Sequence, residues 1–366
     1  MATGQFQPRL VCEDSGLPAN PLAWGCDGGR IAIANLPPFD ADAIDHKQWS
    51  LWRYAAMLPV ERRVTLGEGM TPLVQAEIDG TSLWLKLEYL NPTGSFKDRG
   101  ISVLVNHLLA HAVCQVVEDS SGNAGASLAA YTAGTDIQAR IFAPASAPEG
   151  KKHLITSFGA ELVEVEGPRS ATTEACLQAA QSAVYASHAW SPFFIAGQMT
   201  CAWEIWEQLG QRVPEVIVCC VGQGGLFLGL ARGFKALLAA QLIDHLPRFI
   251  AVQSARCDPI IQAWERGLDS PEPVEQQPSV ADGIAVVEPV RGAEVLQVIR
   301  ETDGAALRVT DTAILEAQSK LGHRGFMVEP TSAVPVAALD SIRRVVGADA
   351  EIVIPLTGSG LKNLRT

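Results

Sequence analysis

The chain has 366 residues, of which 48% are hydrophobic and 19% are charged, and its formal net charge is −12. This composition is that of a globular protein and excludes an intrinsically disordered one. The length suffices for two compact lobes, and the negative charge argues against nucleic acid as a partner, because the phosphate backbone would repel the protein.

We expect a cytoplasmic protein that does not span a membrane. The longest apolar stretch, residues 216–230, is interrupted by the polar and glycine residues of the 222–225 loop, so it reads as strand, loop and helix rather than as one span. The N-terminus lacks the basic start and apolar run of a secretory signal. Without such a signal, the eight cysteines are expected to be reduced thiols.

The first forty or so residues contain two incomplete cysteine motifs, one at Cys12 and the other at Cys26. They resemble a zinc ribbon in which Ser15 and Gly28 stand at the positions of two further ligands. Two cysteines cannot fill a structural zinc site with four ligands, so we predict no metal. We interpret residues 1–45 as a small capping segment.

Strand and helix signals alternate from about residue 83 to the end of the chain. Helical stretches separate most of the strands, as in parallel α/β sheets. The predicted strands are residues 83–88, 114–118, 139–143, 161–165, 215–221, 249–252, 306–309 and 351–355.

Lys97 follows the first of these strands in the segment NPTGSFKDRG, residues 91–100. Asn-Pro and Thr-Gly-Ser are turn formers, and apolar residues recur at helical spacing after the lysine. A lysine at a helix start lies in the positive field of the helix dipole, which helps to lower the pKa of an amine that must form an imine. The alternative is a solvated surface lysine.

Two later loops favour the functional interpretation. The segment 118–125 (EDSSGNAG) and the segment 221–226 (VGQGGL) each follow a predicted strand and open a helix. Backbone N–H groups and the positive end of a helix dipole favour an anion at such a position. A tight turn would explain one glycine-rich loop, but several such loops together with a placed lysine indicate a binding site.

These segments resemble the pyridoxal-phosphate enzymes of the tryptophan-synthase-β fold type, and within that group the threonine synthases. Segments 67–73 (GEGMTPL), 329–333 (EPTSA) and 356–362 (LTGSGLK) extend the resemblance, which runs from Gly67 to Lys362. It implies an α/β fold with two open twisted, mostly parallel sheets flanked by helices, after a small degenerate ribbon. It also implies a homodimer, a small domain at residues 103–185 and a large cofactor-binding domain at 46–102 and 186–366, with the cofactor between them.

The resemblance implies pyridoxal 5′-phosphate as cofactor, with Lys97 forming the Schiff base and then serving as a base beside the substrate Cα. It assigns the cofactor phosphate to the glycine loop, the 3′-oxygen to Asn123 and the pyridine nitrogen to Thr357. A hydroxyl does not force that nitrogen to stay protonated, as an aspartate would, which favours reactions with a departing leaving group. The implied cofactor-binding residues are Lys97, Asn123, Gly222, Gln223, Gly224, Gly225, Leu226 and Thr357.

The substrate carboxylate is assigned by the same resemblance to the helix start after the asparagine loop, where an N-cap is the structural alternative. Glu329 and Ser332 are further candidates, although Glu-Pro-Thr-Ser is also a plain helix start. The predicted substrate-binding residues are Ser120, Ser121, Gly122, Ala124 and His188.

The resemblance to threonine synthases departs at the substrate phosphate. Those enzymes supply an asparagine, a serine and an arginine where this protein has His188, Ala189 and Phe194. A phosphate dianion prefers charged donors, and phenylalanine offers none. Possible substitute cations are Lys151, Lys152 and Arg324, and residues 280–286 (VADGIAV) resemble the serine and threonine dehydratases.

Three hypotheses follow for the function. The first and preferred one is a threonine-synthase-like lyase that converts O-phosphohomoserine to threonine and phosphate. The second is β-elimination or β-replacement, of the dehydratase or of the cysteine- or cysteate-synthase type, on a substrate without a clamped phosphate. The third is a catalytically silent homologue, against which the intact lysine, asparagine, threonine and glycine loop argue.

Overall fold

The computed structural model describes residues 6–27, 29–120, 122–147, 149–275 and 277–363. Contacts between Cα atoms divide the protein into two compact units. The first contains Met1–Gly69, Lys97–Gly197 and Arg365–Thr366, and the second contains Met70–Phe96 and Gln198–Leu364. The domain bounds expected from the sequence, at residues 45, 102 and 185, stay a prediction.

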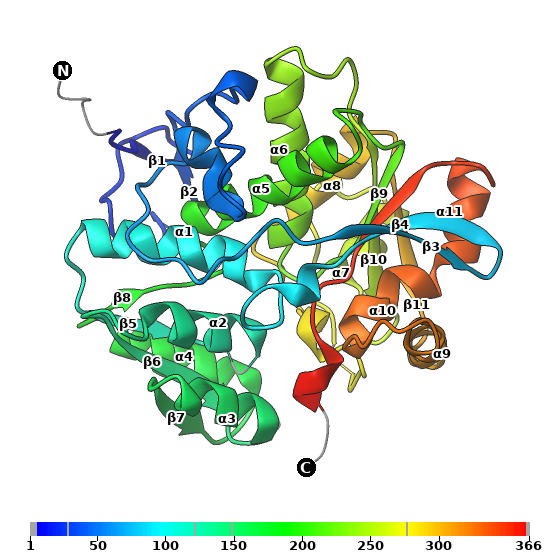
Figure 1. Ribbon diagram of the computed structural model, residues 1–366. Helices are drawn as coiled ribbons and strands as arrows, with labels where there is room; N and C mark the ends of the chain where they lie inside the picture. Colours follow the sequence, from blue (N-terminus) through cyan, green and yellow to red (C-terminus); the bar gives the residue numbers. More distant parts are fainter. Residues whose placement is uncertain (1–5, 28, 121, 148, 276, 364–366) are drawn as a thin grey trace. The chain divides into compact units, whose positions relative to one another are not determined.

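The first unit is built on a four-stranded parallel sheet with strand order β7-β6-β5-β8. Helices α2, α3 and α4 contact its strands (Figure 1). Since all four strands are parallel, the loops after them, including 119–122 and 186–191, leave from one edge, which is where open α/β sheets bind ligands. The elements are β5 (Gln115–Glu118), β6 (Gln138–Pro144), β7 (Glu161–Val165), β8 (Val184–Tyr185), α1 (Lys97–Ala110), α2 (Asn123–Thr132), α3 (Glu149–Ser157) and α4 (Arg169–Ala179).

The N-terminal segment of this unit forms a two-stranded antiparallel sheet, β1 (Leu10–Cys12) and β2 (Ile31–Ile33). Cys12 and Cys26 are joined by a disulfide, with their Cα atoms 5.9 Å apart. The prediction that all cysteines are reduced is therefore wrong for these two, because the fold of the segment brings them within bonding distance. Gly28, the other position compared with a zinc ligand, lies outside the described residues. Two 3₁₀ helices, η1 (Ala41–Ala43) and η2 (Leu51–Met57), follow.

The second unit is built on a six-stranded sheet with strand order β11-β10-β9-β12-β4-β3, in which only the pairing of β3 with β4 is antiparallel. All five residues of β9 are buried, as expected for the continuous apolar run of a central parallel strand. The strands are β3 (Leu73–Ile78), β4 (Thr81–Lys86), β9 (Val216–Cys220), β10 (Arg248–Ser254), β11 (Ala305–Val309) and β12 (Ile352–Pro355).

Helices connect most of these strands, and helical residues such as Ile314, Val334 and Ile342 join strand residues such as Leu85 and Val218 in the core of the second unit. Helix α5 (Pro192–Gln208) begins in the first unit and ends in the second. The others are α6 (Gly225–Ala239), α7 (Pro259–Glu265), α8 (Gly292–Glu301), α9 (Asp311–Gly322), α10 (Pro330–Ala337) and α11 (Leu339–Val346), with the 3₁₀ helices η3 (Glu88–Leu90), η4 (Asp282–Ile284) and η5 (Gly360–Asn363).

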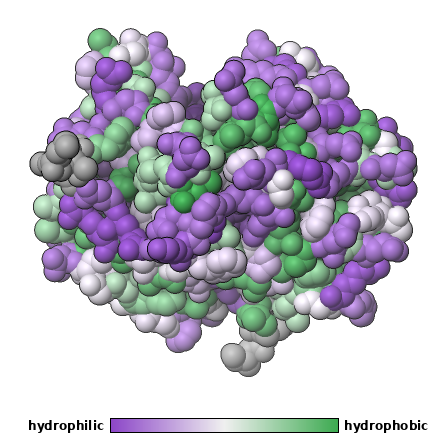
Figure 2. Space-filling view, turned by 45° about the horizontal axis from the view of Figure 1, so that its top comes forward, coloured by the Kyte–Doolittle hydropathy of each residue, from purple (hydrophilic) through white to green (hydrophobic). Residues whose placement is uncertain are grey.

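Every strand predicted from the sequence is present, and the predicted α/β class with two mostly parallel sheets is confirmed. On the face drawn in Figure 2, hydrophilic residues predominate and apolar ones form scattered patches. Among the described residues, none of the helices combines the length and the apolarity that crossing a bilayer requires.

Candidate active site

Lys97 is the first residue of α1, as its surroundings in the sequence predict. The turn that leads to it is bonded to the late glycine segment. Phe96 N–H donates to the carbonyl of Thr357 at 3.0 Å, and Ser359 N–H donates to the carbonyl of Gly94 at 2.9 Å. Two segments that lie far apart in the sequence, and that both carry predicted site residues, are thus hydrogen-bonded partners.

The side chain of Lys97 lies over an aromatic ring. Its Nζ is 5.4 Å from the centroid of the Phe194 ring. Phe194 is fully buried and packs so closely on Gly100 that a Cβ at that glycine would collide with the ring. The position at which threonine synthases are expected to have an arginine is therefore a rigid apolar contact beside the lysine.

The asparagine loop opens α2, as predicted. The N-cap is Gly122, the helix has no capping hydrogen bond from a side chain of the described residues, and Ala124 is buried in its first turn. Gly122 N–H donates to Ser120 Oγ at 3.4 Å. Ser121 lies outside the described residues. The helix start thus presents small residues, Gly122 and Ala124.

The glycine loop joins β9 to α6. Gly224 is the N-cap in a left-handed conformation with φ of 89°, and the helix is not capped by a side chain of any described residue. The first intrahelical bond runs from Leu228 N–H to the Gly224 carbonyl, so the preceding N–H groups of the first turn lack an intrahelical acceptor. A Cβ at Gly224 would lie 2.8 Å from Val295 Cγ2, and one at Gly222 3.1 Å from Ile284 Cα. The Gln223 side chain turns away to accept from Val290 N–H at 2.9 Å.

Thr357 follows β12 and is 3% exposed. Its hydroxyl lies 3.0 Å from Ser332 Oγ of α10, and Ser332 Oγ also accepts from Gly358 N–H at 2.7 Å. Glu329 is the N-cap residue of the same helix. The two hydroxyls therefore form a buried pair of neutral groups.

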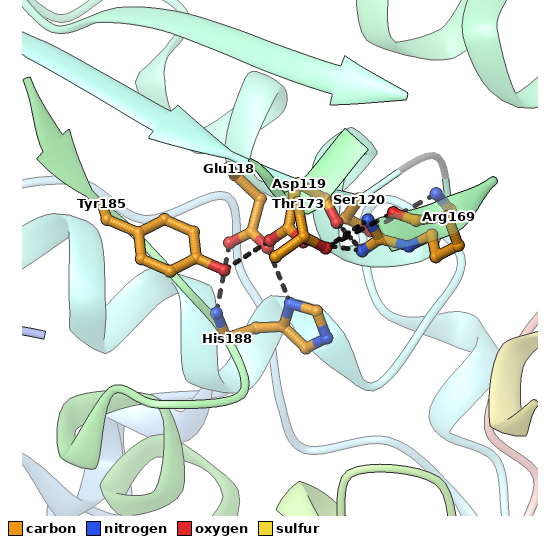
Figure 3. Close-up of polar contacts among 8 residues, drawn as sticks. Glu118, Asp119, Ser120, Arg169, Thr173, Tyr185 and His188 are labelled. Atoms are coloured by element: carbon orange, nitrogen blue, oxygen red, sulfur yellow. Dashed lines mark hydrogen bonds and ion pairs between the residues drawn. The ribbon is translucent and has the colours of Figure 1, made fainter. Parts of the chain in front are cut away.

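His188 lies in the loop after β8 and is fixed by Glu118, the last residue of β5 (Figure 3). Its Nδ1 is 2.9 Å from Glu118 Oε1, and its backbone N–H donates to Glu118 Oε2 at 3.2 Å. The His188 ring meets the Phe194 ring edge-on, with centroids 5.8 Å apart. His188 and Lys97 therefore contact the same phenylalanine.

Burial dominates the protonation of this pair. The Glu118 side chain is fully buried, and desolvation, reinforced by the neighbouring Asp119 charge, raises its pKa well above the usual value. Desolvation, together with the positive charge of Lys97, holds the pKa of His188 well below its usual value. Both shifts favour the uncharged forms, a carboxylic acid and a neutral imidazole.

Asp119 forms a second cluster directly after Glu118 (Figure 3). Tyr185 OH donates to Asp119 Oδ1 at 2.5 Å, and Thr173 Oγ1 donates to Oδ2 at 2.7 Å. Arg169, at the start of α4, forms an ion pair with Oδ2 at 2.9 Å and also donates to the Asp119 carbonyl. These contacts anchor the backbone from which Ser120 and the rest of the loop continue.

The cations considered as substitutes for the missing arginine have other partners. Lys152 Nζ pairs with Glu149 at 2.5 Å and with Glu164 at 2.8 Å. Arg324 donates to the carbonyl of Glu77 at 2.6 Å. The side chain of Lys151 lies outside what the structure describes. Lys152 and Arg324 are therefore held by hydrogen bonds and ion pairs to neighbouring elements, at Glu164 of β7 and Glu77 of β3.

Two carboxylates that support the site were not predicted from the sequence. Glu68 is fully buried and accepts hydrogen bonds from Trp52 Nε1 at 2.7 Å, Tyr131 OH at 2.8 Å and Ser102 Oγ. It thereby ties α1, which begins with Lys97, to α2, which begins with Asn123. Glu118 was expected only to end a strand. The sequence feature that could have pointed to both glutamates is an acidic residue surrounded by apolar residues and glycines.

Comparisons with known proteins identify the family. The model of the family described as pyridoxal-phosphate dependent enzyme matches residues 64–358. A threonine synthase of Methanosarcina acetivorans is 36% identical over 93% of this chain and 87% of its own length. Those of Methanocaldococcus jannaschii and Mycobacterium leprae are 33% and 32% identical, over 87% and 88% of this chain and 82% and 91% of theirs.

Solved structures with the same fold support this assignment. A T.th. threonine deaminase is 28% identical, with a TM-score of 0.67 over 79% of this chain and 92% of its own. Maize serine racemase is 25% identical, with a TM-score of 0.67 over 79% of this chain and 88% of its own. The protein thus belongs to the family of pyridoxal-phosphate-dependent enzymes, as its lysine segment, its glycine loops and its fold together indicate.

Proposed function

We propose that the protein is a pyridoxal-phosphate-dependent lyase of the threonine-synthase type. It removes the leaving group from the side chain of an amino acid and adds water, with O-phosphohomoserine as the preferred substrate and threonine and phosphate as products. The observation that carries this proposal is the similarity to a threonine synthase at 36% identity over 93% of the chain.

Two features of the glycine loop support a phosphate site. The backbone at Gly222 and Gly224 packs so closely on Ile284 and Val295 that a Cβ would crowd them, and the start of α6 offers N–H groups that are not capped by a side chain of the described residues. Hydrogen bonds to a charged oxygen contribute about 1.5–3 kcal/mol each. We assign the cofactor phosphate to the backbone of Gly222, Gln223, Gly224, Gly225 and Leu226.

The remaining cofactor contacts are assigned to side chains at element starts and ends. Lys97 would bind the cofactor covalently, Asn123 would donate to its 3′-oxygen, and Thr357 would face its ring nitrogen. Pyridoxal phosphate, when bound, supplies an electron sink that acidifies the Cα–H of the amino acid. The amine of Lys97, which begins α1, would take that proton once the substrate has released it.

Thr357→Asp is expected to lower turnover by about 10²-fold, since an aspartate would keep the ring nitrogen protonated and hold back the departure of the leaving group. It would also put a charge beside the buried Ser332 hydroxyl. Steady-state kinetics of the loaded enzyme, with Thr357→Ser as the matched control that keeps the hydroxyl, measure the effect. An aspartate variant as active as the parent would contradict the role of Thr357.

The substrate would be held at the start of α2 and beside His188. We assign the substrate carboxylate to the helix start at Ser120, Gly122 and Ala124, together with Ser121, which lies outside the described residues, and His188 would face the substrate side chain. A second function, β-elimination or β-replacement without a phosphate clamp, is favoured by one observation. Phe194 is fully buried against Gly100, so its ring cannot move aside to admit another cation in place of the arginine that a phosphate clamp requires.

A substrate panel with the pure, cofactor-loaded enzyme separates these functions. Release of phosphate and formation of threonine from O-phosphohomoserine support the threonine-synthase reaction. Keto acid from serine or threonine, with no phosphate released from O-phosphohomoserine, supports the second function and contradicts the first.

We infer the biological setting from similarity and charge. We propose a cytoplasmic homodimer with a small domain at residues 103–185, which acts on a free amino acid and binds neither nucleic acid nor membrane. The net charge of −12 supports the last point. The Cys12–Cys26 disulfide makes the compartment testable, because a reducing cytoplasm would keep these two thiols open to alkylation in protein isolated under quenching conditions.

A further inference from the structure

We propose that His188 is the acid that protonates the leaving oxygen of the substrate, and that Glu118 is the positioning residue that supplies the proton behind it. The inference rests on the proposed function, because it concerns the step in which the leaving oxygen separates from the carbon of the substrate. His188 stands where a threonine synthase is expected to have a phosphate-binding asparagine, and here it takes a catalytic role.

Geometry is the first argument. Glu118 engages His188 with both oxygens, Oε1 at 2.9 Å from Nδ1 and Oε2 at 3.2 Å from the backbone nitrogen that donates to it. The pKa of Glu118 is raised and that of His188 lowered by burial, so with the carboxyl protonated and the imidazole neutral, Oε2 is the carbonyl oxygen that accepts from the backbone N–H, and Oε1 carries the hydrogen and donates to Nδ1. The hydrogen of the neutral imidazole then resides on Nε2, which points away from Glu118 (Figure 3).

Nε2 is left available for a substrate. None of the hydrogen bonds found among the described residues involves it, and 16% of the His188 side chain is exposed although Glu118 beneath it is fully buried. The backbone N–H of His188 already fastens the loop to Glu118. Fastening the loop therefore does not require the imidazole Nε2. The pair also lies at the carboxyl edge of a parallel sheet, where ligands bind.

Lys97 places the pair near the reacting carbons. Its Nζ and the imidazole of His188 both contact the Phe194 ring, at 5.4 Å and 5.8 Å from its centroid. Burial keeps Glu118 protonated and His188 neutral, as their pKa directions indicate. The other charged groups around the pair are Asp119 and Arg169, which are bound to each other at 2.9 Å.

The proton balance is complete without a further reactant. When the C–O bond breaks, its electron pair stays on the oxygen, which takes the hydrogen of Nε2, while the carboxyl hydrogen of Glu118 passes to Nδ1. The pair is then a carboxylate and a neutral imidazole protonated on Nδ1. When water adds to the carbon, it gives a proton to Nε2, and Nδ1 returns its hydrogen to Glu118. One elimination followed by one addition therefore restores the pair.

A comparison of leaving groups tests the role of His188. O-Phosphohomoserine with homoserine, and O-phosphoserine with serine, share a carbon skeleton and differ in the leaving group, of which hydroxide needs a proton far more than phosphate does. We expect His188→Asn and Glu118→Gln to lower kcat by about 10²–10⁴-fold on the hydroxyl substrates and by less than about tenfold on the phosphate esters. Thr173→Val, in the neighbouring Asp119 cluster, is the matched control and should lower both members of each pair equally. Equal losses on both members in His188→Asn would overturn the proposal.

Nitrogen NMR of the imidazole provides a readout that does not depend on turnover. With ¹⁵N-labelled histidine, the signal missing in His188→Asn identifies His188, and we expect a neutral ring protonated on Nε2 at neutral pH, because burial lowers its pKa. Glu118→Gln should keep this tautomer, because its amide also donates to Nδ1. A ring protonated on Nδ1, or charged at neutral pH, would refute the pair as described. An enzyme that turns over no amino acid of either pair would instead refute the proposed function, while the NMR result would still stand.

Discussion

Replacing Lys97 by alanine is expected to abolish covalent attachment of the cofactor and to lower turnover by roughly 10³-fold or more, since one side chain both binds the cofactor and moves the Cα proton. The lysine begins α1 directly after a turn that is hydrogen-bonded to Thr357 and Ser359. Borohydride reduction followed by peptide mapping should find the mass of the reduced cofactor on the peptide that contains Lys97 in the parent protein and on no peptide of the variant.

Two further variants make this result specific. Lys97→Arg keeps the positive charge beside Phe194 but cannot form the covalent link, so it should lose as much activity as the alanine variant. Lys47→Ala removes an exposed lysine of the same unit and should leave attachment and turnover unchanged. Cofactor mass on another lysine of the parent protein would show that Lys97 is not the attachment residue.

Lys86→Met is expected to destabilise the protein by about 3–5 kcal/mol, because it leaves a buried charge without its partner. Lys86 lies in β4, and its Nζ is 2.7 Å from Glu204 Oε2 of α5, with both side chains fully buried. The same ammonium donates to the Thr71 carbonyl at 2.6 Å and to Gln208 at 2.9 Å. Urea unfolding followed by circular dichroism measures the loss of stability.

Matched variants separate the charge from the packing. In Lys86→Met combined with Glu204→Gln, no charge is left uncompensated and the amide oxygen can still accept from Met70 N–H, so most of the loss should be recovered. Lys235→Met breaks a half-exposed pair with Glu301 of nearly the same length, 2.6 Å, and should cost less than about 1 kcal/mol. A Lys86 variant as mild as the Lys235 variant would mean that water reaches the buried pair.

Hydrophobic patterning accounts for the part of the fold that could be predicted. The predicted strands include β9, whose residues are all buried and therefore form a continuous apolar run. The strands that were not predicted are β1, β2, β3 and β8. They have two to six residues, and β3 pairs at the edge of its sheet with every second or third residue exposed. Short or half-exposed strands carry too little apolar pattern to be separated from loops.

Local patterns in the sequence were sufficient for the fold class, the family and the segments from which a site is proposed, because turn formers, glycines and a lysine at helix starts leave a signature at Lys97, Asn123, Gly224 and Thr357. Only the folded protein shows which polar side chains and which cysteines contact each other. Glu118 with His188, Lys86 with Glu204, Glu68 with Tyr131 and the Cys12–Cys26 disulfide each join positions well separated in the sequence. Such pairings depend on how strands and helices pack around a core, and a single sequence carries no local pattern for them.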